Sequence, residues 1–190
     1  MALQLVTPPT EFPVPLSRAK HHMRVDSCDQ NDLILAYIGA ATEWAQNYTR
    51  RQFVTATFDL FLDRFCPVIL VPRSPLVSVT SVKYLDEGGT EQTVSATDYV
   101  VDSASAPGRV TLAEGASWPG IQPVANAVRV RFVAGYGDQD AVPDGVRAAI
   151  LLLTAHLYEY REPVITGTII NTVPMSVKSL LGTHRIAEVF

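Results

Sequence analysis

Ser117 lies in a run that comes within one residue of the G-x-S-x-G motif of serine nucleophiles, Gly115-Ala116-Ser117-Trp118-Pro119. That motif needs a sharp turn between a strand and a helix, which exposes the serine oxygen. Pro119 replaces the second glycine, and the surrounding sequence shows no strand-turn-helix pattern. We therefore interpret this run as a loop between strands and not as a catalytic elbow.

A glycine-rich turn, Gly135-Tyr136-Gly137, stands between a strand pattern and a helix pattern, as a dinucleotide-binding loop does. Asp140 occupies the position where such a loop has its third glycine. Its negative charge would oppose the pyrophosphate of a bound dinucleotide. The sequence therefore predicts an ordinary turn that leads into the following helix.

Two histidine arrangements have the residue types of a metal site. His156 and Glu159 share a helix face, but a bundle metal site needs matching ligands from other helices, and the first long helix offers only Glu43 near its middle. His21 and His22 are adjacent, so on a helix they point about 100° apart. We expect a histidine–glutamate hydrogen bond in the first case and a solvated surface in the second.

The two cysteines, Cys28 and Cys66, lie far apart and belong to no cluster of zinc-binding spacing, so we expect two reduced thiols. The sequence also shows no convergent Ser/His/Asp or Cys/His set. It therefore predicts no catalytic residue, no metal site, no cofactor and no enzymatic activity.

Basic residues gather where the first long helix meets the predicted strands. The candidates for lining a DNA channel are Arg50, Arg51, Arg129 and Arg131, with Arg64 and Arg73 nearby in the same region. The favoured alternative is structural, with helix C-terminal charge for the first pair and solvent-facing strand positions for the others. A formal net charge of -4 and a charged fraction of 18% disfavour tight non-specific DNA binding, which depends on neutralising phosphates.

The elements that position these residues change character along the chain. Asp29 to Arg51 repeats apolar residues at helical spacing with Asp29 as N-cap, and a shorter helix capped by Ser17 is expected to run to about Arg24. From Phe53 to Tyr136 the period changes to two, which predicts about six strands. Helix returns from Pro143 to about Arg161.

The predicted strands are short and bounded by proline, glycine and aspartate. They are Thr57–Leu62, Val68–Val71, Val79–Leu85, Tyr99–Asp102, Arg109–Leu112 and Ala127–Val133. Glu87-Gly88-Gly89 predicts a tight reversal into a further strand, Gln92-Thr93-Val94, because glycine accepts a positive φ. Arg129 and Arg131 alternate with valine and phenylalanine, which predicts one apolar and one basic face for the last strand.

These elements predict an α+β fold, a helical bundle core of two long helices plus short helices, with an inserted antiparallel β domain and an extended C-terminal tail. The divisions are an extended, proline-rich N-terminal arm at 1–16, a helical body at 17–52 and 141–162, the β domain at 53–140, and a docking tail at 163–190 with a short helix from Met175 to Leu181. A hydrophobic fraction of 47% over 190 residues is enough for a core. The longest apolar run, Ala148 to Leu153, is too short to span a bilayer, so we expect a soluble protein with no membrane partner.

Residues Pro15 to Asp26, PLSRAKHHMRVD, are similar to the opening LxxAKxHLRVD of the phage head-tail connector proteins. Further stretches in the same order resemble this family, including its branch labelled possible DNA-packaging protein. They are Pro72–Val79, Asp98–Asp102, Phe132–Gly137, Val142–Leu153 and Tyr158–Glu162. Together they extend over roughly residues 15 to 163.

The resemblance implies a structural protein of the virion at the head-tail interface. It implies a homo-oligomeric ring, commonly of twelve copies, that sits below the portal, extends the channel for DNA in transit and offers a platform to a downstream tail or stopper protein. It implies no catalysis. The family fold is a helical bundle, so Phe53 to Tyr136 marks a larger branch.

The tail is too apolar for an idle terminus, and we hypothesise that it docks on the portal. The expected anchors are Met175, Val177, Leu180, Leu181, Ile186 and Phe190. Two alternatives stay open for the chain as a whole. One is a DNA-packaging-associated DNA-binding protein, and the other is a small-ligand-binding or enzymatic β domain.

Overall fold

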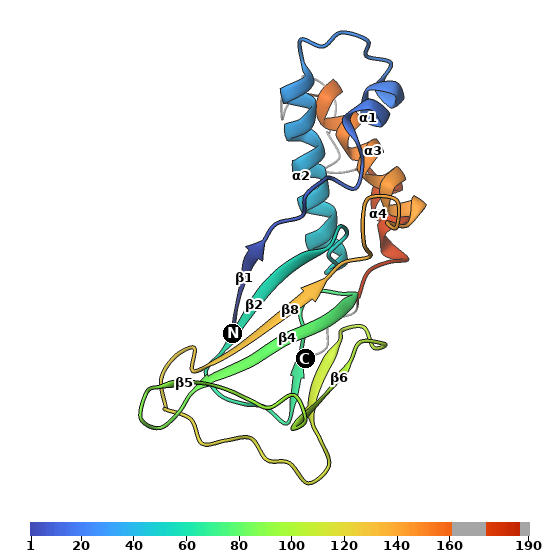
Figure 1. Ribbon diagram of the computed structural model, residues 1–190. Helices are drawn as coiled ribbons and strands as arrows, with labels where there is room; N and C mark the ends of the chain where they lie inside the picture. Colours follow the sequence, from blue (N-terminus) through green and yellow to red (C-terminus); the bar gives the residue numbers. More distant parts are fainter. Residues whose placement is uncertain (161–173, 187–190) are drawn as a thin grey trace. The chain divides into compact units, whose positions relative to one another are not determined.

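The computed structural model describes residues 1–160 and 174–186, and these residues form two compact units (Figure 1). Met1–Pro9 and Thr55–Tyr136 make up the first, which we call the β unit. Thr10–Val54 and the described residues from Gly137 onward make up the second, which we call the helical unit. The α+β class is therefore as predicted.

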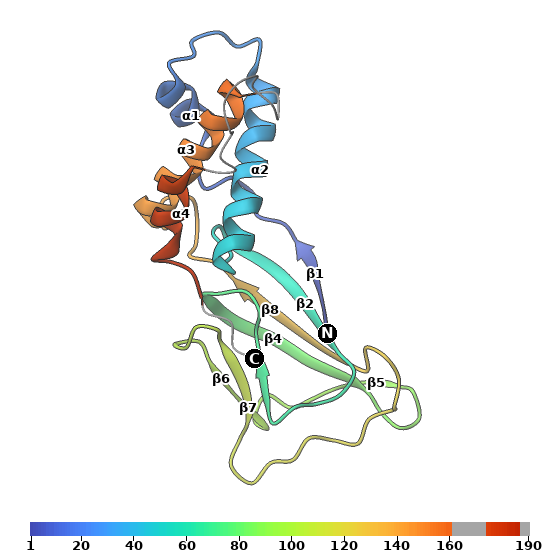
Figure 2. The ribbon, with the colours of Figure 1, turned by 180° about the vertical axis from the view of Figure 1, so that it is seen from behind.

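The β unit contains two antiparallel sheets. The larger one has the strand order β1-β2-β8-β4-β5, with β1 at Ala2–Thr7, β2 at Ala56–Leu62, β8 at Val128–Ala134, β4 at Leu76–Leu85 and β5 at Glu91–Thr93. The smaller one has the order β3-β7-β6, with β3 at Val68–Leu70, β7 at Arg109–Leu112 and β6 at Tyr99–Asp102 (Figure 2).

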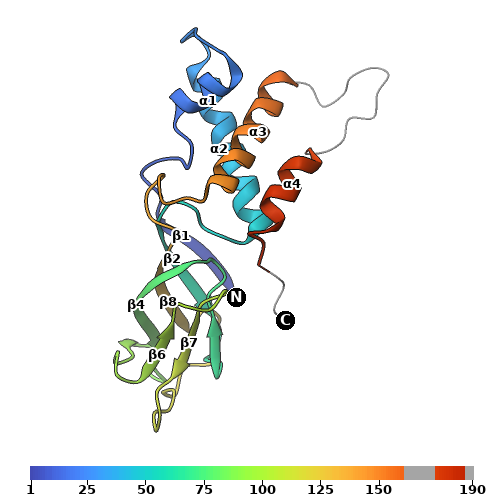
Figure 3. The ribbon, with the colours of Figure 1, turned by 90° about the vertical axis from the view of Figure 1, so that its right-hand side faces the viewer.

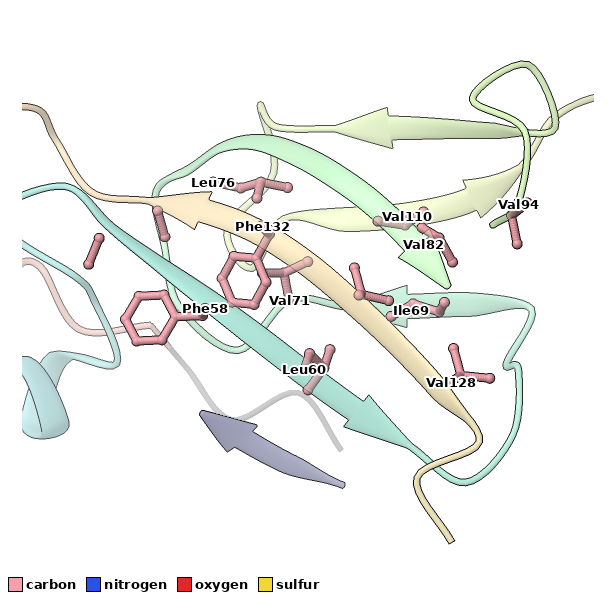
Figure 4. Close-up of a cluster of buried hydrophobic side chains, with 13 residues drawn as sticks. Phe58, Leu60, Ile69, Val71, Leu76, Val82, Val94, Val110, Val128 and Phe132 are labelled. Carbon is pink, nitrogen blue, oxygen red and sulfur yellow. The ribbon is translucent and has the colours of Figure 1, made fainter. Parts of the chain in front are cut away.

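The core of the β unit draws its side chains from both sheets (Figure 4). Phe58 of β2 and Phe132 of β8 are paired in register and stack with ring centroids 5.5 Å apart. Ile69 of β3 and Val110 of β7 join the same cluster from the smaller sheet. Strand β8 alternates buried and half-buried residues along its whole length, which confirms its predicted apolar and basic faces.

The predicted strands are present with ends that move by at most three residues, and the expected reversal joins β4 to β5. Its glycine requirement is met at Gly89, whose φ is 81° and whose N–H donates to the Asp86 carbonyl at 2.9 Å. The prediction missed strand β1. Residues 2–7 of the expected N-terminal arm are extended, but they lie in the sheet beside β2 and not apart from it. Four prolines follow within residues 8–15, and only Val6 and Thr7 of the run Ala2–Thr7 have high β-propensity, so the local pattern gave little indication of a strand.

The helical unit contains four helices, α1 at Leu16–Met23, α2 at Asn31–Thr49, α3 at Asp144–Glu159 and α4 at Met175–Gly182. The two long helices pack together as predicted, α1 contacts both of them, and α4 packs against α3 and α2 (Figure 3). Ile34 and Ile38 of α2 and Ile150 of α3 are fully buried. These apolar positions recur at helical spacing, which is why the sequence pattern located the helices.

Two predicted N-caps were wrong. Helix α2 begins at Asn31 with Gln30 as N-cap, and the Asp29 carboxylate instead accepts a hydrogen bond from the Ser27 hydroxyl at 2.7 Å. Helix α1 begins before Ser17, because the Pro15 carbonyl already accepts the N–H of Ala19 at 3.2 Å. In both places local backbone geometry outweighs the preference of a capping side chain.

Both α1 and α2 end on an arginine in the left-handed conformation. Arg24 has φ 56°, and the next N–H, that of Val25, donates to the Lys20 carbonyl at 3.0 Å. Arg50 has φ 59°, and the N–H of Arg51 donates to the Gln46 carbonyl at 3.2 Å. This arrangement satisfies carbonyls at a helix end, and glycine is its usual residue.

Candidate assembly surfaces

The loop that resembles a nucleophile elbow is held by aromatic packing. Trp118 stacks on Phe65 with ring centroids 4.5 Å apart, and its indole N–H donates to the Cys66 carbonyl at 3.0 Å. The run lies between β7 and β8 with no helix following it. The predicted interpretation as a loop between strands is therefore confirmed, and Trp118 is a packing residue.

The other chemical candidates have local structural roles. Gly135 and Gly137 have φ values of 140° and 136°, and the Gly135 N–H closes onto the Pro75 carbonyl at 3.0 Å. His156 lies against the ring of Tyr160 with centroids 5.0 Å apart. Cys28 is an exposed thiol and Cys66 a half-buried one, and neither is in a disulfide. Within residues 1–160 and 174–186, no three His, Cys, Asp or Glu side chains gather as a metal site would require.

Arg131, a candidate for a DNA channel, forms a two-bond ion pair within the β unit. Its Nε and a terminal nitrogen donate to the two oxygens of Asp59 at 2.8 Å each. Asp59 lies opposite on β2 with its side chain 5% exposed. The hydrogen bonds from Arg131 hold the pKa of Asp59 below its usual range, and the Asp59 carboxylate raises the pKa of Arg131.

The remaining candidate arginines also have partners. Arg129 of β8 pairs with Glu91 of β5, which also accepts a hydrogen bond from Lys83 at 2.9 Å. In the helical unit the Arg51 Nε donates to the His184 carbonyl at 2.6 Å. Arg50 is the left-handed residue that ends α2. Arg129 and Arg131 thus pair with carboxylates of their own unit, and Arg51 with a backbone carbonyl of its own unit.

Helix α4 packs against the rest of the helical unit. Val177 and Leu181 are fully buried, and Ile186 is 9% exposed. The chain after α4 is tied to the end of α2, because the Ile186 N–H donates to the Thr49 carbonyl at 3.1 Å. Arg185 lies over the ring of Tyr48 at 5.1 Å.

Of the six expected portal anchors, two have outward surface in the described structure. Met175 is 78% exposed and Leu180 is half-buried. Val177, Leu181 and Ile186 are used as internal packing residues of the helical unit. Phe190 lies outside the described residues, as do 163–173 of the expected docking tail.

Exposed apolar side chains also mark the edges of the β unit. On β1, Leu3, Leu5 and Val6 are 37%, 48% and 39% exposed. On β4, Val77 is 53% exposed. In the sequence, the uncharged run Ala2–Thr7 is the signal for such an exposed edge.

No helix among the described residues has both the length and the apolar character needed to cross a membrane. The exposed apolar residues of the described chain are scattered over strands, loops and helix ends.

Residues 14–105 match the family described as phage gp6-like head-tail connector protein. The whole chain also matches solved structures. A chain from the neck of an empty gene transfer agent (GTA) particle, computed with C6 symmetry, has 27% identity and a TM-score of 0.83 over 100% of this chain and 98% of that one.

The chain resembles the phage head-tail connector family over residues 14–105, and its whole fold resembles that of a particle-neck chain. Two further similar structures agree, with the same coverage of 100% and 98%. One is a chain from the virion of a native GTA particle, with 25% identity and a TM-score of 0.81. The other is from the neck of a native GTA particle computed with C12 symmetry, with 26% identity and a TM-score of 0.79. No curated protein matches the sequence.

As a connector, the chain has a structural role at the head-tail interface of the virion. The family match ends at residue 105, whereas the likeness to the neck chains spans both units. The β unit is therefore part of the shared architecture and not an addition peculiar to this sequence. The six-fold and twelve-fold symmetry of those necks supports a ring oligomer for this connector as well.

Proposed function

We propose that this connector forms a twelve-copy ring between the portal and the tail, and that the ring extends the DNA channel. The observation that carries the proposal is the full-length likeness to a chain from a particle neck, at a TM-score of 0.83. Six-fold symmetry is contained in twelve-fold symmetry, so twelve copies agree with both neck structures. The role is assembly, with no substrate turned over.

The partners on the two sides of the ring follow from the connector role. We propose the portal protein on the head side and a downstream tail or stopper protein on the other. DNA passes through without sequence-specific binding. A conduit works best when DNA slides, and a net charge of -4 with paired arginines suits sliding better than a sticky basic lumen does.

The portal contact is proposed at the exposed side of α4. Met175 begins that helix with 78% of its surface exposed, and Leu180, five residues further on, is half-buried. Methionine is flexible and polarisable, so it adapts well to a partner surface. Val177 and Leu181 stabilise the position of α4 from beneath.

The test uses point variants, because deleting residues 174–190 would also remove buried side chains from the helical unit. We expect Met175→Glu to keep its thermal unfolding midpoint and to lose co-purification with the portal protein. Val100→Glu, at a valine 54% exposed in the β unit, is the matched control and should co-purify normally. Class averages of the wild-type complex then give the copy number.

Two results would contradict the proposal. Unchanged portal binding by Met175→Glu would remove α4 as the contact. Class averages with a copy number other than twelve, or with no ring on the portal, would overturn the ring itself.

A further inference from the structure

Strand β1 is an edge strand with a free side. It pairs with β2, and no other strand of residues 1–160 and 174–186 pairs with it. In an antiparallel ladder, alternate residues direct their N–H and C=O groups to opposite sides. The outer side of β1 therefore offers a row of backbone donors and acceptors, and all six of its residues are exposed.

This edge lacks the devices by which proteins prevent edge pairing. Edge strands are commonly protected by charged side chains, proline, or very short length. The six residues of β1, Ala-Leu-Gln-Leu-Val-Thr, contain no charge and no proline. The one irregularity in the pairing of β1 with β2 lies at its end, between Leu5 and Thr7. Strand β1 is thus open to pairing with another strand.

The opposite side of the same sheet has a second open stretch. Strand β5 covers β4 only at Lys83–Leu85, and the Val94 N–H reaches the Val82 carbonyl at 2.8 Å. Upstream, Leu76–Ser81 pairs with β8 on one side and with no strand of the described residues on the other. This stretch is also free of charge and proline, and Val77 is 53% exposed. Two register shifts interrupt the pairing of this stretch with β8, between Leu76 and Ser78 and between Val79 and Ser81.

The strand directions of the two open edges are compatible. Each neighbour in the order β1-β2-β8-β4 is antiparallel, so β1 and β8 run one way and β2 and β4 the other. A β1 strand of a second copy, placed beside β4 so that the sheet continues, is therefore antiparallel to β4. The alternation of the sheet continues without interruption from one copy to the next.

The side chains at the two edges are compatible as well. Apolar rows cross the sheet from β1 to β4 on its core side, and they are Leu5-Phe58-Phe132-Val79 and Leu3-Leu60-Val130-Val82. The leucines at the β1 end are the exposed members of these rows. On the other face, the row that begins at Gln4 ends at Ser81, so no like charges meet at the junction.

We propose that β1 of one connector subunit adds to the open edge of β4, Leu76–Ser81, in the next subunit. The contact uses two different surfaces of the chain, and a head-to-tail contact of this kind generates a closed ring when its rotation closes. The inference rests on the ring of the proposed function and specifies one of its lateral contacts. The occupant of the β1 edge is a second copy of this chain.

Disulfide trapping in the assembled ring tests the contact directly. In a background of Cys28→Ser and Cys66→Ser, Gln4→Cys is combined with Ser78→Cys or Ser81→Cys, which share one face of the sheet. We expect at least one pair to give a ladder of covalent trimers and larger species on oxidation. Each single-cysteine variant should give no more than trace dimer. A strong dimer from Gln4→Cys alone would mean that β1 pairs with β1, and it would overturn the proposal.

The second test places a charged side chain on the β1 edge. Leu5→Lys should unfold at a temperature close to that of wild type, since Leu5 is 48% exposed, yet raise the concentration needed for ring formation at least tenfold. Val124→Lys, at a loop valine 40% exposed, is the matched control and should assemble normally.

The outcomes separate this contact from the ring itself. If Leu5→Lys forms rings like wild type and no cysteine pair cross-links, β1 is not the lateral contact, while the connector ring stands. If β1 becomes protected from amide hydrogen exchange only when another neck protein is added, that protein is the occupant and the proposal fails. If wild-type subunits form no ring on the portal, the proposed function fails first.

Discussion

Asp59 is a nearly buried carboxylate on the face of the larger sheet that lies opposite to the core. Its neighbours on β2, Phe58 and Leu60, point into the core, so its own side chain lies on the opposite face of the sheet. There Arg131 covers it with two hydrogen bonds and leaves 5% of the side chain exposed. A carboxylate with so little solvent depends on its partner, because removing one member of a desolvated pair leaves the other uncompensated.

We predict that Asp59→Asn lowers the free energy of unfolding of the β unit by about 2 kcal/mol at pH 7. The asparagine keeps the size of the side chain but loses the charge that faces Arg131. Urea unfolding followed by tryptophan fluorescence measures the change. Glu114→Gln, at an exposed loop residue, serves as the control and should stay within about 0.5 kcal/mol of wild type.

The same pair predicts a dependence on acid. Because the pKa of Asp59 is lowered in the folded chain, its contribution to stability is complete above the ordinary value near 3.8 and is lost as the pH falls through the folded pKa. The difference between wild type and Asp59→Asn should therefore shrink as unfolding is repeated at successively lower pH. A difference that stays constant down to pH 2 would contradict this role.

His184 gives the helical unit a dependence on pH of its own. Burial, helped by the charge of Arg51, lowers the pKa of His184 below its ordinary 6.5. The unfolded chain then binds the proton more tightly, so stability is complete above pH 6.5 and falls as the pH drops below it. We expect thermal unfolding midpoints measured at pH 7.5 and 5.5 to differ less for His184→Gln than for wild type. An equal difference would show that His184 does not titrate with unfolding.

At the scale of elements, the two arginine-ended helices carry a backbone cost. A non-glycine residue in the left-handed conformation costs roughly 1–2 kcal/mol, and glycine avoids most of it. Arg24 is exposed, so its side chain adds little packing to offset that cost. We predict that Arg24→Gly raises the free energy of unfolding by about 0.5–1 kcal/mol, whereas Arg24→Ala leaves it unchanged or lower. Chemical denaturation of wild type, Arg24→Gly and Arg24→Ala measures these free energies of unfolding. A lower value for Arg24→Gly than for wild type would contradict the prediction.

Elements with long repeats were predictable, and elements that depend on distant partners were not. The apolar spacing of α2 and α3 and the alternation of β8 come from burial on one face, which a sequence pattern records directly. Strand β1 has no buried residue at all, so its place beside β2 depends on backbone pairing across more than fifty residues. The expected caps Asp29 and Ser17 were wrong for a local reason, since turns of the nearby backbone decide where those helices begin.

The same distinction between local pattern and distant packing applies to the candidate assembly residues. The sequence pattern predicted the short helix at Met175, a loop at Ser117 and a turn at Gly135, as the structure has them. Whether an apolar residue of that helix faces its own chain or a partner depends on tertiary packing. Val177 and Leu181 turned out to face inward, while Met175 faces outward. Open sheet edges follow from strand order, which the local pattern does not contain.

At the scale of the whole molecule, several basic side chains of the described residues are paired with carboxylates of their own unit. Arg129 and Lys83 share Glu91, Arg131 has Asp59, and Arg147 lies 2.6 Å from Asp144. A surface of this kind is suited to assembly, where neighbouring subunits approach one another closely. It is poorly suited to holding phosphates, since each arginine would first have to leave a carboxylate.

We predict that the isolated chain does not retain double-stranded DNA at micromolar concentration in 50 mM salt. Its net charge is -4, and the candidate arginines Arg129 and Arg131 are paired with carboxylates, so these two would release few counterions on binding. Fluorescence anisotropy of a labelled duplex, titrated with the chain between 50 and 200 mM salt, measures this. The double variant Asp59→Asn and Glu91→Gln frees Arg131, Arg129 and Lys83 and should bind measurably at 50 mM salt, with an affinity that falls steeply as salt is added. Tight, salt-sensitive binding by the wild-type chain would contradict the balance of charges and would favour the DNA-binding alternative instead.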